Sequence, residues 1–161
     1  FDDYAKQNPE IEKSFLFVTD GYNFRNTEIG AVLGISQLKK LNSFIEQRRK
    51  NYFEYYKILS TSDKFYPVKF HEGNSSFCFP LICKTIEIKK RLIELFNFYS
   101  IEYRPIVGGN LLKHPYIDYS IDQSSKNINV DILHYCGVYI GNSQFVGKND
   151  MKIFKKIINE V

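Results

Sequence analysis

The chain has 161 residues, of which 43% are hydrophobic and 25% are charged, which is typical of one globular domain and too short for two. Its 14 phenylalanines and 12 tyrosines supply large side chains for a core and exclude a low-complexity linker. The formal net charge of +4 comes from cations spread along the sequence. This charge suits an anionic small ligand and falls short of the clustered basic face of a nucleic-acid-binding protein.

The sequence predicts a cytoplasmic protein that does not associate with membranes. No segment approaches the roughly 18 apolar residues that a bilayer crossing needs, and residues 1–10 lack the layout of a signal peptide. Three cysteines without a CxxC spacing argue against a disulfide framework and a zinc site, so we expect three free thiols and no metal. Because the chain begins with Phe1 and its only methionine is Met151, we expect either processing or a piece of a longer polypeptide.

Two segments precede the middle of the chain. Residues 15–18 are a short apolar run that favours a strand or an extended arm. Apolar residues then recur at intervals of three and four, which predicts a helix over 28–41. Asn26 or Thr27 is placed to cap its first turn.

A second helix is expected directly after the first. Ser43 and Glu46 have the spacing of a capping box, which predicts a start at Ser43, a bend at Asn42 and an end near Ser60. Its predicted inner face consists of Ile45, Arg48 or Arg49, Tyr52, Tyr56 and Leu59.

Short elements of mixed type follow. Residues 65–70 and 76–83 read as strands, and Pro67 and Pro80 favour edge positions or bulges for them. Thr85 is expected to cap a third helix.

The remaining elements complete an alternating order. They are a helix over 86–99, a strand over 101–107, a polar loop over 111–129, a helical turn over 130–135, a strand over 137–140 and a last helix over 150–159 behind an Asn149 cap. This order predicts an α+β layer with the helices on one face of a sheet.

Two corners of the sequence suit an anion. Asn23 and Arg25, in the turn that begins at Gly21, precede a predicted helix N-terminus, where free N–H groups and the helix dipole favour phosphate. Arg104 lies on a predicted strand that ends at Gly108-Gly109-Asn110. An ordinary turn at the first corner and an exposed ion pair at Arg104 stay open as alternatives.

Other chemistry-bearing residues are isolated. His71, His114 and His134 stand in different elements without a neighbouring carboxylate, so structural roles stay open for each. The sequence contains no G-x-S-x-G, P-loop or G-x-G-x-x-G motif. From the residues alone, the chain is a cytoplasmic α+β domain with two anion-favouring corners.

The segment that begins at Gly21 resembles the DegT/DnrJ/StrS family of pyridoxal-phosphate-dependent sugar aminotransferases and dehydratases. It carries G-Y-N-x-R, then a helix of the form A-x-x-G-x-x-Q-L-x-x-L that ends at Leu41, and then a helix containing Arg48-Arg49. The resemblance extends over nearly the whole chain and implies a fold type I, aspartate-aminotransferase-like enzyme. It implies that residues 1–41 are the end of the large-domain region with a linking helix, and that 42–161 are the C-terminal small domain.

The resemblance also implies roles for individual residues. Asn23 would contact the phosphate of pyridoxal 5'-phosphate in the partner subunit of a homodimer. The residues implied to face the nucleotide-sugar are Arg25, Arg104, Asn110, His114 and Asn142. The R-P-x-x-x-G-N stretch from Arg104 to Asn110 and the Y-x-G-N stretch that ends at Asn142 resemble the 3-dehydratase branch.

The same resemblance implies that the catalytic residue lies outside this segment. Lys6 and Lys13 have no Gly-rich surroundings, so neither is assigned as the residue that bears the cofactor, and the segment alone is expected to be inactive. The expected function is 3-dehydration of nucleotide-linked 4-keto-6-deoxy sugars for surface polysaccharides. An aminotransferase with an amino donor such as glutamate, and a non-catalytic domain that binds nucleotide-sugar or mediates assembly, stay open as alternatives.

Overall fold

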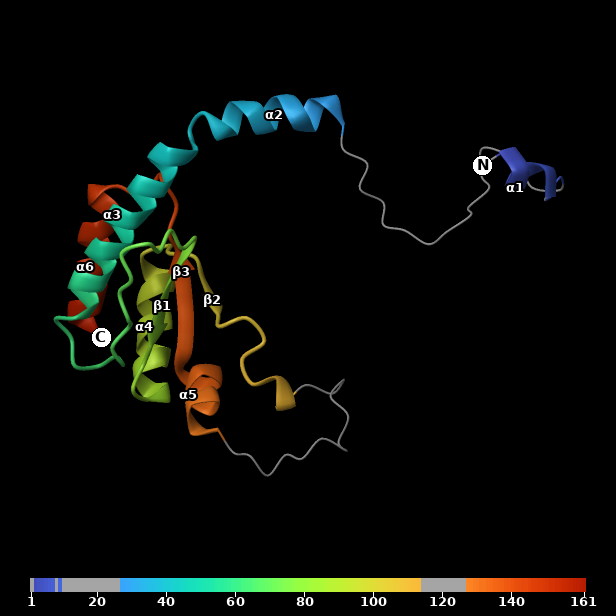
Figure 1. Cartoon of the computed structure of the whole chain (residues 1–161). Coiled ribbons are helices and arrows are strands. Elements are labelled where there is room, and N and C mark those ends of the chain that lie inside the picture. Colours follow the sequence, from blue (N-terminus) through green and yellow to red (C-terminus); the bar gives the residue numbers. More distant parts are fainter. Residues whose placement is uncertain (1, 8, 10–26, 114–126) are drawn as a thin grey trace. The chain divides into compact units, whose positions relative to one another are not determined.

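The computed structural model describes residues 2–7, 9, 27–113 and 127–161, and Figure 1 shows their secondary structure. The chain divides into two compact units, Phe1–Leu38 and Lys39–Val161. The predicted strand or arm over 15–18 lies outside the described residues. The assignment of 1–41 to a large-domain region and of 42–161 to a small domain stays a prediction.

The first unit contains two helices. Helix α1 (Asp2–Gln7) was not predicted, whereas α2 (Glu28–Leu38) confirms most of the predicted helix over 28–41. The N–H of Gly30 donates to Thr27 Oγ1 at 3.2 Å, which confirms Thr27 as a cap. No residue of α2 is buried.

The second unit is a three-stranded antiparallel sheet with helices packed on it. Its elements are α3 (Leu41–Leu59), β1 (Cys78–Ile82), α4 (Ile86–Phe98), β2 (Tyr103–Pro105), the 3-10 turn η2 (Leu111–Lys113), α5 (Ile128–Cys136), β3 (Gly137–Gly141) and α6 (Lys148–Glu160). The strand order is β1-β3-β2, so β3 is central. The α+β class predicted from the sequence is confirmed.

One face of the sheet forms the core. Phe79 and Leu81 of β1 and Val138 and Ile140 of β3 are buried, because alternate residues of a strand point to the same face. They pack against buried side chains of α3, α4 and α6, which are Tyr52, Tyr55, Leu59, Leu92, Leu95, Phe96, Phe154, Ile157 and Ile158. The predicted placement of helices on one face is thus confirmed (Figure 1).

Aromatic rings fill the centre of this core. The Phe79 ring lies 5.0 Å from that of Tyr52 and 5.2 Å from that of Tyr55, centroid to centroid. Phe154 of α6 contacts Tyr55 edge-on at 4.9 Å. Offset and edge-on ring pairs stabilise such cores beyond the area that they bury, so these rings hold α3 and α6 on β1.

The predicted start of the second helix is wrong. Helix α3 begins at Leu41, and its N-cap, Lys40, makes no side-chain cap. The Ser43 hydroxyl donates to the carbonyl oxygen of Lys40 at 2.8 Å. Because this hydroxyl bonds back to the first turn, the predicted capping box does not form.

The inner face of α3 also differs by one position from the prediction. Asn51 and Tyr55 are buried, whereas Tyr56, which was predicted to be internal, is only half-buried. A shift of one residue turns a helix by about 100°, so the spacing of aromatic residues alone does not decide between neighbouring tyrosines.

The strands are shorter than predicted. The predicted strand over 65–70 is reduced to a single bridge between Phe65 and Cys83, and β2 keeps three residues of the predicted 101–107. Pro80 lies on the edge strand β1, as predicted. A proline lacks the N–H that pairing on both sides requires, which explains this placement.

Helix ends follow local capping signals in one case and not in another. Thr85 caps α4 as predicted, because its Oγ1 accepts from the N–H of Ile88 at 3.3 Å. The predicted Asn149 cap is wrong, since α6 begins at Lys148 behind Gly147. The N–H of Gly147 donates to Asp150 Oδ2 at 2.7 Å, and this carboxylate closes the first turn in place of Asn149.

Candidate functional site

Six residues were predicted to contact ligands, and the structure describes three of them. Asn23, Arg25 and His114 lie outside the described residues, so their roles stay predictions. The other three residues, Arg104, Asn110 and Asn142, belong to the second unit.

These three residues are distributed along the central strand β3. Arg104 lies opposite Tyr139 in the middle of β3. Asn110 bonds to α5, which leads into the start of β3, whereas Asn142 follows its last residue. Five residues of strand separate the two ends by about 16 Å. The second unit therefore does not bring Asn110 and Asn142 into one contact set.

Arg104 is an exposed cation on the side of the sheet away from the helices. Its guanidinium bonds Glu102 Oε1 at 2.6 Å, and the two side chains are 64% and 77% exposed. Exposed ion pairs contribute little to stability, so Arg104 can exchange Glu102 for an anionic ligand at small cost.

Asn110 joins a turn of the chain to helix α5 through three hydrogen bonds. Its Nδ2 donates to Asp131 Oδ1 at 2.9 Å, and its backbone N–H donates to His134 Nδ1 at 3.1 Å. Its Oδ1 accepts from the N–H of Leu112 at 3.0 Å. Because Nδ1 accepts, the His134 ring is held with its proton on Nε2.

Asp131 is surrounded by donors. Lys113 Nζ lies 3.4 Å from its Oδ1. The hydrogen bond from Asn110 and then the contact with Lys113 lower the pKa of Asp131 below its usual 3.8. The pKa of Lys113 is raised by its interaction with Tyr135 and then by Asp131. This cluster therefore remains charged and paired at neutral pH.

The turn before Asn110 has an unusual backbone. Val107 has a φ of 38° and is 87% exposed, although β-branched residues strongly disfavour the left-handed region. Gly109 has a φ of 61°, and a Cβ there would collide with His134 Nδ1. Strained turns of this kind cluster at ligand-binding sites, which agrees with the prediction that this segment contacts a ligand.

Asn142 is a buried connection between three segments. Its side chain is 1% exposed, and its Nδ2 donates to the carbonyl oxygens of Arg48 at 3.0 Å and Ser76 at 2.8 Å. Its backbone N–H donates to the carbonyl oxygen of Phe77 at 2.7 Å. Both side-chain donors are used within the protein, so only its Oδ1 is available to another group.

Unsatisfied polar atoms gather around this connection. Among the described residues, the buried side-chain atoms without a hydrogen-bond partner are Arg48 Nε, Ser75 Oγ and Asn142 Oδ1. All three belong to the segments that Asn142 connects. Because buried polar groups are nearly always paired, such a cluster marks a candidate binding corner. The sequence analysis gave Arg48 no ligand role and missed Ser75, for which the sequence contains no signal.

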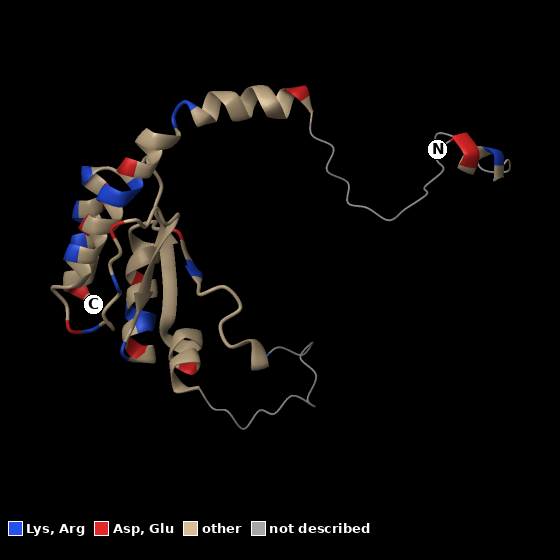
Figure 2. Ribbon diagram, in the orientation of Figure 1, with Lys and Arg blue, Asp and Glu red and all other residues tan. Residues whose placement is uncertain are grey.

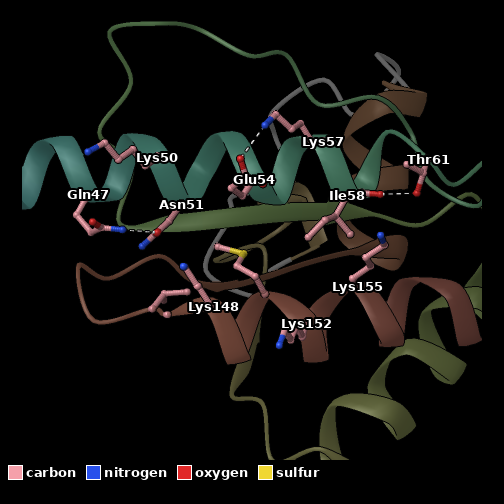
Figure 3. A pocket seen from close by; sticks show the side chains of 13 residues that line it. Gln47, Lys50, Asn51, Glu54, Lys57, Ile58, Thr61, Lys148, Lys152 and Lys155 are labelled. Carbon is pink, nitrogen blue, oxygen red and sulfur yellow. Dashed lines mark hydrogen bonds and ion pairs between the residues drawn. The ribbon is translucent and has the colours of Figure 1, made fainter.

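A groove of about 740 Å³ lies between α3 and α6, away from Arg104, Asn110 and Asn142 (Figure 3). Its described lining residues are Gln47, Lys50, Asn51, Glu54, Lys57, Ile58, Thr61, Val146, Gly147, Lys148, Met151, Lys152 and Lys155. Its volume lies within the range of ligand sites, about 300–1,000 Å³.

The described residues contain no covalent anchor for an aldehyde cofactor. Such an anchor is a lysine desolvated in a pocket. Every lysine in the described ranges is exposed except Lys89, whose Nζ donates to the carbonyl oxygen of Tyr135 at 3.0 Å. In the same ranges, no group of three or more His, Cys, Asp and Glu side chains could hold a metal ion. None of the helices described combines the length and apolar composition that a bilayer crossing needs.

Comparison with known families shows one match. Residues 4–133 match the model of the DegT/DnrJ/EryC1/StrS aminotransferase family. The match contains α2, α3, α4 and most of α5, and with them Asn23, Arg25, Arg104, Asn110 and His114.

Curated relatives resemble the chain over most of its length. GDP-4-keto-6-deoxy-D-mannose 3-dehydratase from Escherichia coli is 39% identical over 96% of this chain and 41% of the relative. The enzyme of the same name from Yersinia pseudotuberculosis is 40% identical over 83% of this chain and 35% of the relative. The chain therefore spans about two-fifths of the length of these enzymes.

Solved structures have the same fold over the matched part. A GDP-4-keto-6-deoxymannose-3-dehydratase with a trapped PLP-glutamate geminal diamine superimposes with a TM-score of 0.72 at 33% identity, over 91% of this chain and 39% of that one. The same enzyme with bound GDP-perosamine gives 0.70 at 34% identity, over the same shares of the two chains. An aminotransferase from Psychrobacter cryohalolentis gives 0.71 at 14% identity, over 97% of this chain and 44% of that one, which shows the shared fold alone.

Proposed function

The chain belongs to the DegT/DnrJ/EryC1/StrS aminotransferase family, and we propose that it is the C-terminal part of a pyridoxal-phosphate-dependent 3-dehydratase. The proposed substrate is a nucleotide-linked 4-keto-6-deoxy sugar of the GDP-4-keto-6-deoxymannose class. The observation that carries the proposal is the 39% identity to such a dehydratase over 96% of the chain. The predicted 3-dehydratase branch agrees with the enzymes that match.

In the proposed enzyme, this chain binds and orients the substrate. Residues 42–161 are the small domain, and residues 1–41 join it to the large domain. Pyridoxal phosphate supplies, when bound, the electron sink that lets the C3 hydroxyl of the sugar leave. Glutamate is the proposed amino donor, because a related dehydratase was solved with PLP-glutamate. Asn23 donates to the cofactor phosphate in the partner subunit of a homodimer.

Cations and amides of the chain hold the sugar-nucleotide. Arg104 is exposed and only weakly engaged by Glu102, which leaves its planar donors available for a phosphate. Asn110 sets the position of the strained turn beside it through its bonds to α5. Arg25 and His114 complete the proposed contacts with the substrate.

Asn142 acts in the proposed site mainly as a positioning residue. Its two donors hold Arg48 and the segment before β1, and its free Oδ1 lies among the unsatisfied atoms of the same corner. Arg48 Nε offers a donor there that suits an anionic group. Arg48 and Ser75 therefore join the residues that we assign to substrate binding.

Two other functions remain to be distinguished from this one. A sugar aminotransferase of the same family would keep the C3 hydroxyl and place an amino group on the keto carbon. A non-catalytic domain would bind the GDP-sugar or an assembly partner without chemistry. The description of the matched family as aminotransferases favours the first of these as the second candidate.

The proposal is tested with a chimera in which this chain replaces the matched two-fifths of the Escherichia coli dehydratase. The purified chimera is incubated with pyridoxal phosphate, glutamate and GDP-4-keto-6-deoxymannose, and the sugar product is identified by mass spectrometry and NMR. We expect loss of the C3 hydroxyl by the chimera and no turnover by the chain alone.

Three outcomes would contradict the proposal. An aminated sugar that keeps its C3 hydroxyl would support the aminotransferase. A folded chimera that binds GDP-sugar without turnover would support the non-catalytic domain. A folded, cofactor-loaded chimera that binds no GDP-sugar would remove the assignment of this chain to substrate binding.

A further inference from the structure

The groove between α3 and α6 combines an apolar floor with cationic edges. Ile58, Val146 and Met151 form the floor, and all three are half-buried and packed on the core. In Figure 3, side chains of α3 and α6 point into the space between the two helices from opposite sides. Because methionine is flexible and polarizable, a floor that contains it adapts to different apolar side chains.

The charge of the chain is concentrated at this groove. Five lysines and one glutamate line it, so its formal charge equals the net charge of +4 of the whole chain. All other charged residues of the sequence therefore balance to zero. Figure 2 shows the cationic positions recurring along α3 and α6.

Most of these lysines are not engaged by acids. Lys57 bonds Glu54 at 2.7 Å and lies over the Phe53 ring. Within the described part of the chain, no ion pair involves Lys50, Lys148, Lys152 or Lys155. Lys148, Lys152 and Lys155 follow one another at i, i+4 and i+7, so they lie on one face of α6.

We propose that this groove is a docking site for an acidic amphipathic helix of a partner protein. Apolar side chains at i, i+4 and i+7 of such a helix would contact the floor at Ile58, Val146 and Met151. Carboxylates beside them would pair with the free lysines. The lysines from Lys148 to Lys155 extend over about 10 Å of helix, which matches carboxylates spaced along two turns.

The lining disfavours the other anionic partners. Among the residues described, no arginine and no aromatic side chain lines the groove. Bases of single-stranded nucleic acid stack on aromatic rings, and bidentate recognition of phosphate uses arginine. A compact phosphate needs donors that converge on one point, whereas these lysines are spread along two helices. The apolar floor also gives a protein helix contacts that a nucleic acid cannot use.

The test measures binding of a defined peptide to the full chain. The probe is a fluorescein-labelled peptide of about four helical turns, with leucines at i, i+4 and i+7 and glutamates at the flanking positions. Fluorescence anisotropy is expected to show saturable binding that weakens as salt is raised. A peptide with glutamines in place of the glutamates, and one with serines in place of the leucines, should each bind at least about tenfold more weakly.

Charge-reversal variants locate the site. The double variant Lys152→Glu/Lys155→Glu is expected to weaken peptide binding by at least about tenfold, since two attractions become repulsions. Lys90→Glu, a matched change on the exposed surface of α4 outside the groove, should change it less than about twofold. Circular dichroism of each variant verifies that the helices are intact.

Four results would overturn the proposal. They are no saturable binding of the acidic peptide, equal binding by the double variant and wild type, equal binding of the glutamine peptide, and displacement of the peptide by a single-stranded oligonucleotide or phosphatidylserine vesicles at lower concentration than by unlabelled peptide. None of these measurements involves a sugar-nucleotide or pyridoxal phosphate, so the docking site and the proposed enzymatic function can fail separately.

Discussion

The side-chain amide of Asn142 donates to the carbonyl oxygen of Arg48 at 3.0 Å across a sequence separation of 94 residues. This bond, together with the one to Ser76, connects the end of β3 to the long helix α3 and to the segment before β1. The same corner holds the unsatisfied Arg48 Nε. Stability of the unit and the position of a proposed ligand donor therefore depend on one amide.

Asn142→Ala is expected to lower the free energy of unfolding by about 2–4 kcal/mol, because it leaves two buried carbonyl oxygens without donors. Urea unfolding followed by circular dichroism measures this difference. Asn97→Ala, on the exposed surface of α4, is the control and should change stability by less than about 0.5 kcal/mol. Equal effects of the two variants would show that the bonds of Asn142 add nothing to stability.

Gly109→Ala should be strongly destabilising. Its φ of 61° and the collision of a Cβ with His134 Nδ1 both oppose a side chain there, and we expect a loss of about 2–3 kcal/mol. Gly141→Ala is the matched control, because a Cβ at Gly141 meets nothing within 4 Å. Thermal unfolding distinguishes the two variants, and a wild-type melting temperature for Gly109→Ala would contradict the described turn.

The Asp131 carboxylate predicts an acid-dependent contribution to stability. Its pKa is lowered in the folded state by Asn110 and Lys113, so the unfolded state binds the proton more readily. Its contribution is present above pH 3.8 and is lost as pH falls through the lower folded pKa. Asp131→Asn cannot titrate, so its difference in stability from wild type should shrink below pH 3.8 in urea unfolding at a series of pH values. A difference that is independent of pH would contradict this assignment.

The cysteines should differ in reactivity. Burial, and then the neighbouring Cys136, raises the pKa of Cys83 to about 12, so almost no thiolate exists at pH 8. Cys78 is half-buried, and all three cysteines are free, as the sequence predicted. Ellman's reagent should modify Cys78 in the native protein and Cys83 only in urea, as peptide mapping would show. Rapid native labelling of Cys83 would mean that this end of β1 opens.

Arg104→Ala should affect ligand binding without affecting the fold. Its only ion pair in the described chain, with Glu102, is exposed, so stability should change by less than about 0.5 kcal/mol. In the chimera, loss of a phosphate contact should raise KM for the GDP-sugar by about tenfold or more. Arg91→Ala, which removes another exposed pair, with Glu94, is the control and should leave KM unchanged. An unchanged KM for Arg104→Ala would remove this residue from the proposed site.

Local signals in the sequence predicted the helices better than the strands. The Thr85 cap is a contact between residues three apart, so the sequence contains both partners next to each other. The length of β2 depends instead on how far it pairs with β3, which stands more than thirty residues later. The start of α6 was misjudged because the carboxylate of Asp150 competes with Asn149 for the same role.

The candidate site shows the same division. The motif around Arg104 and Asn110 was visible as a pattern, and the strained backbone at Val107 agrees with it. Arg48 and Ser75 were not visible as ligand residues, because only the folded chain brings them to Asn142.

By itself, the sequence determined the family, the α+β class and the helices whose caps lie within one turn, because these depend on residue types at short spacing. Only the tertiary structure decided that Asn110 and Asn142 stand at opposite ends of β3, and that lysines spread along the sequence meet in the groove between α3 and α6. The physical reason is that packing of Phe79 and Phe154 against Tyr55 sets the distance between these elements. Contacts of that kind join residues nearly a hundred positions apart, and no local pattern encodes them.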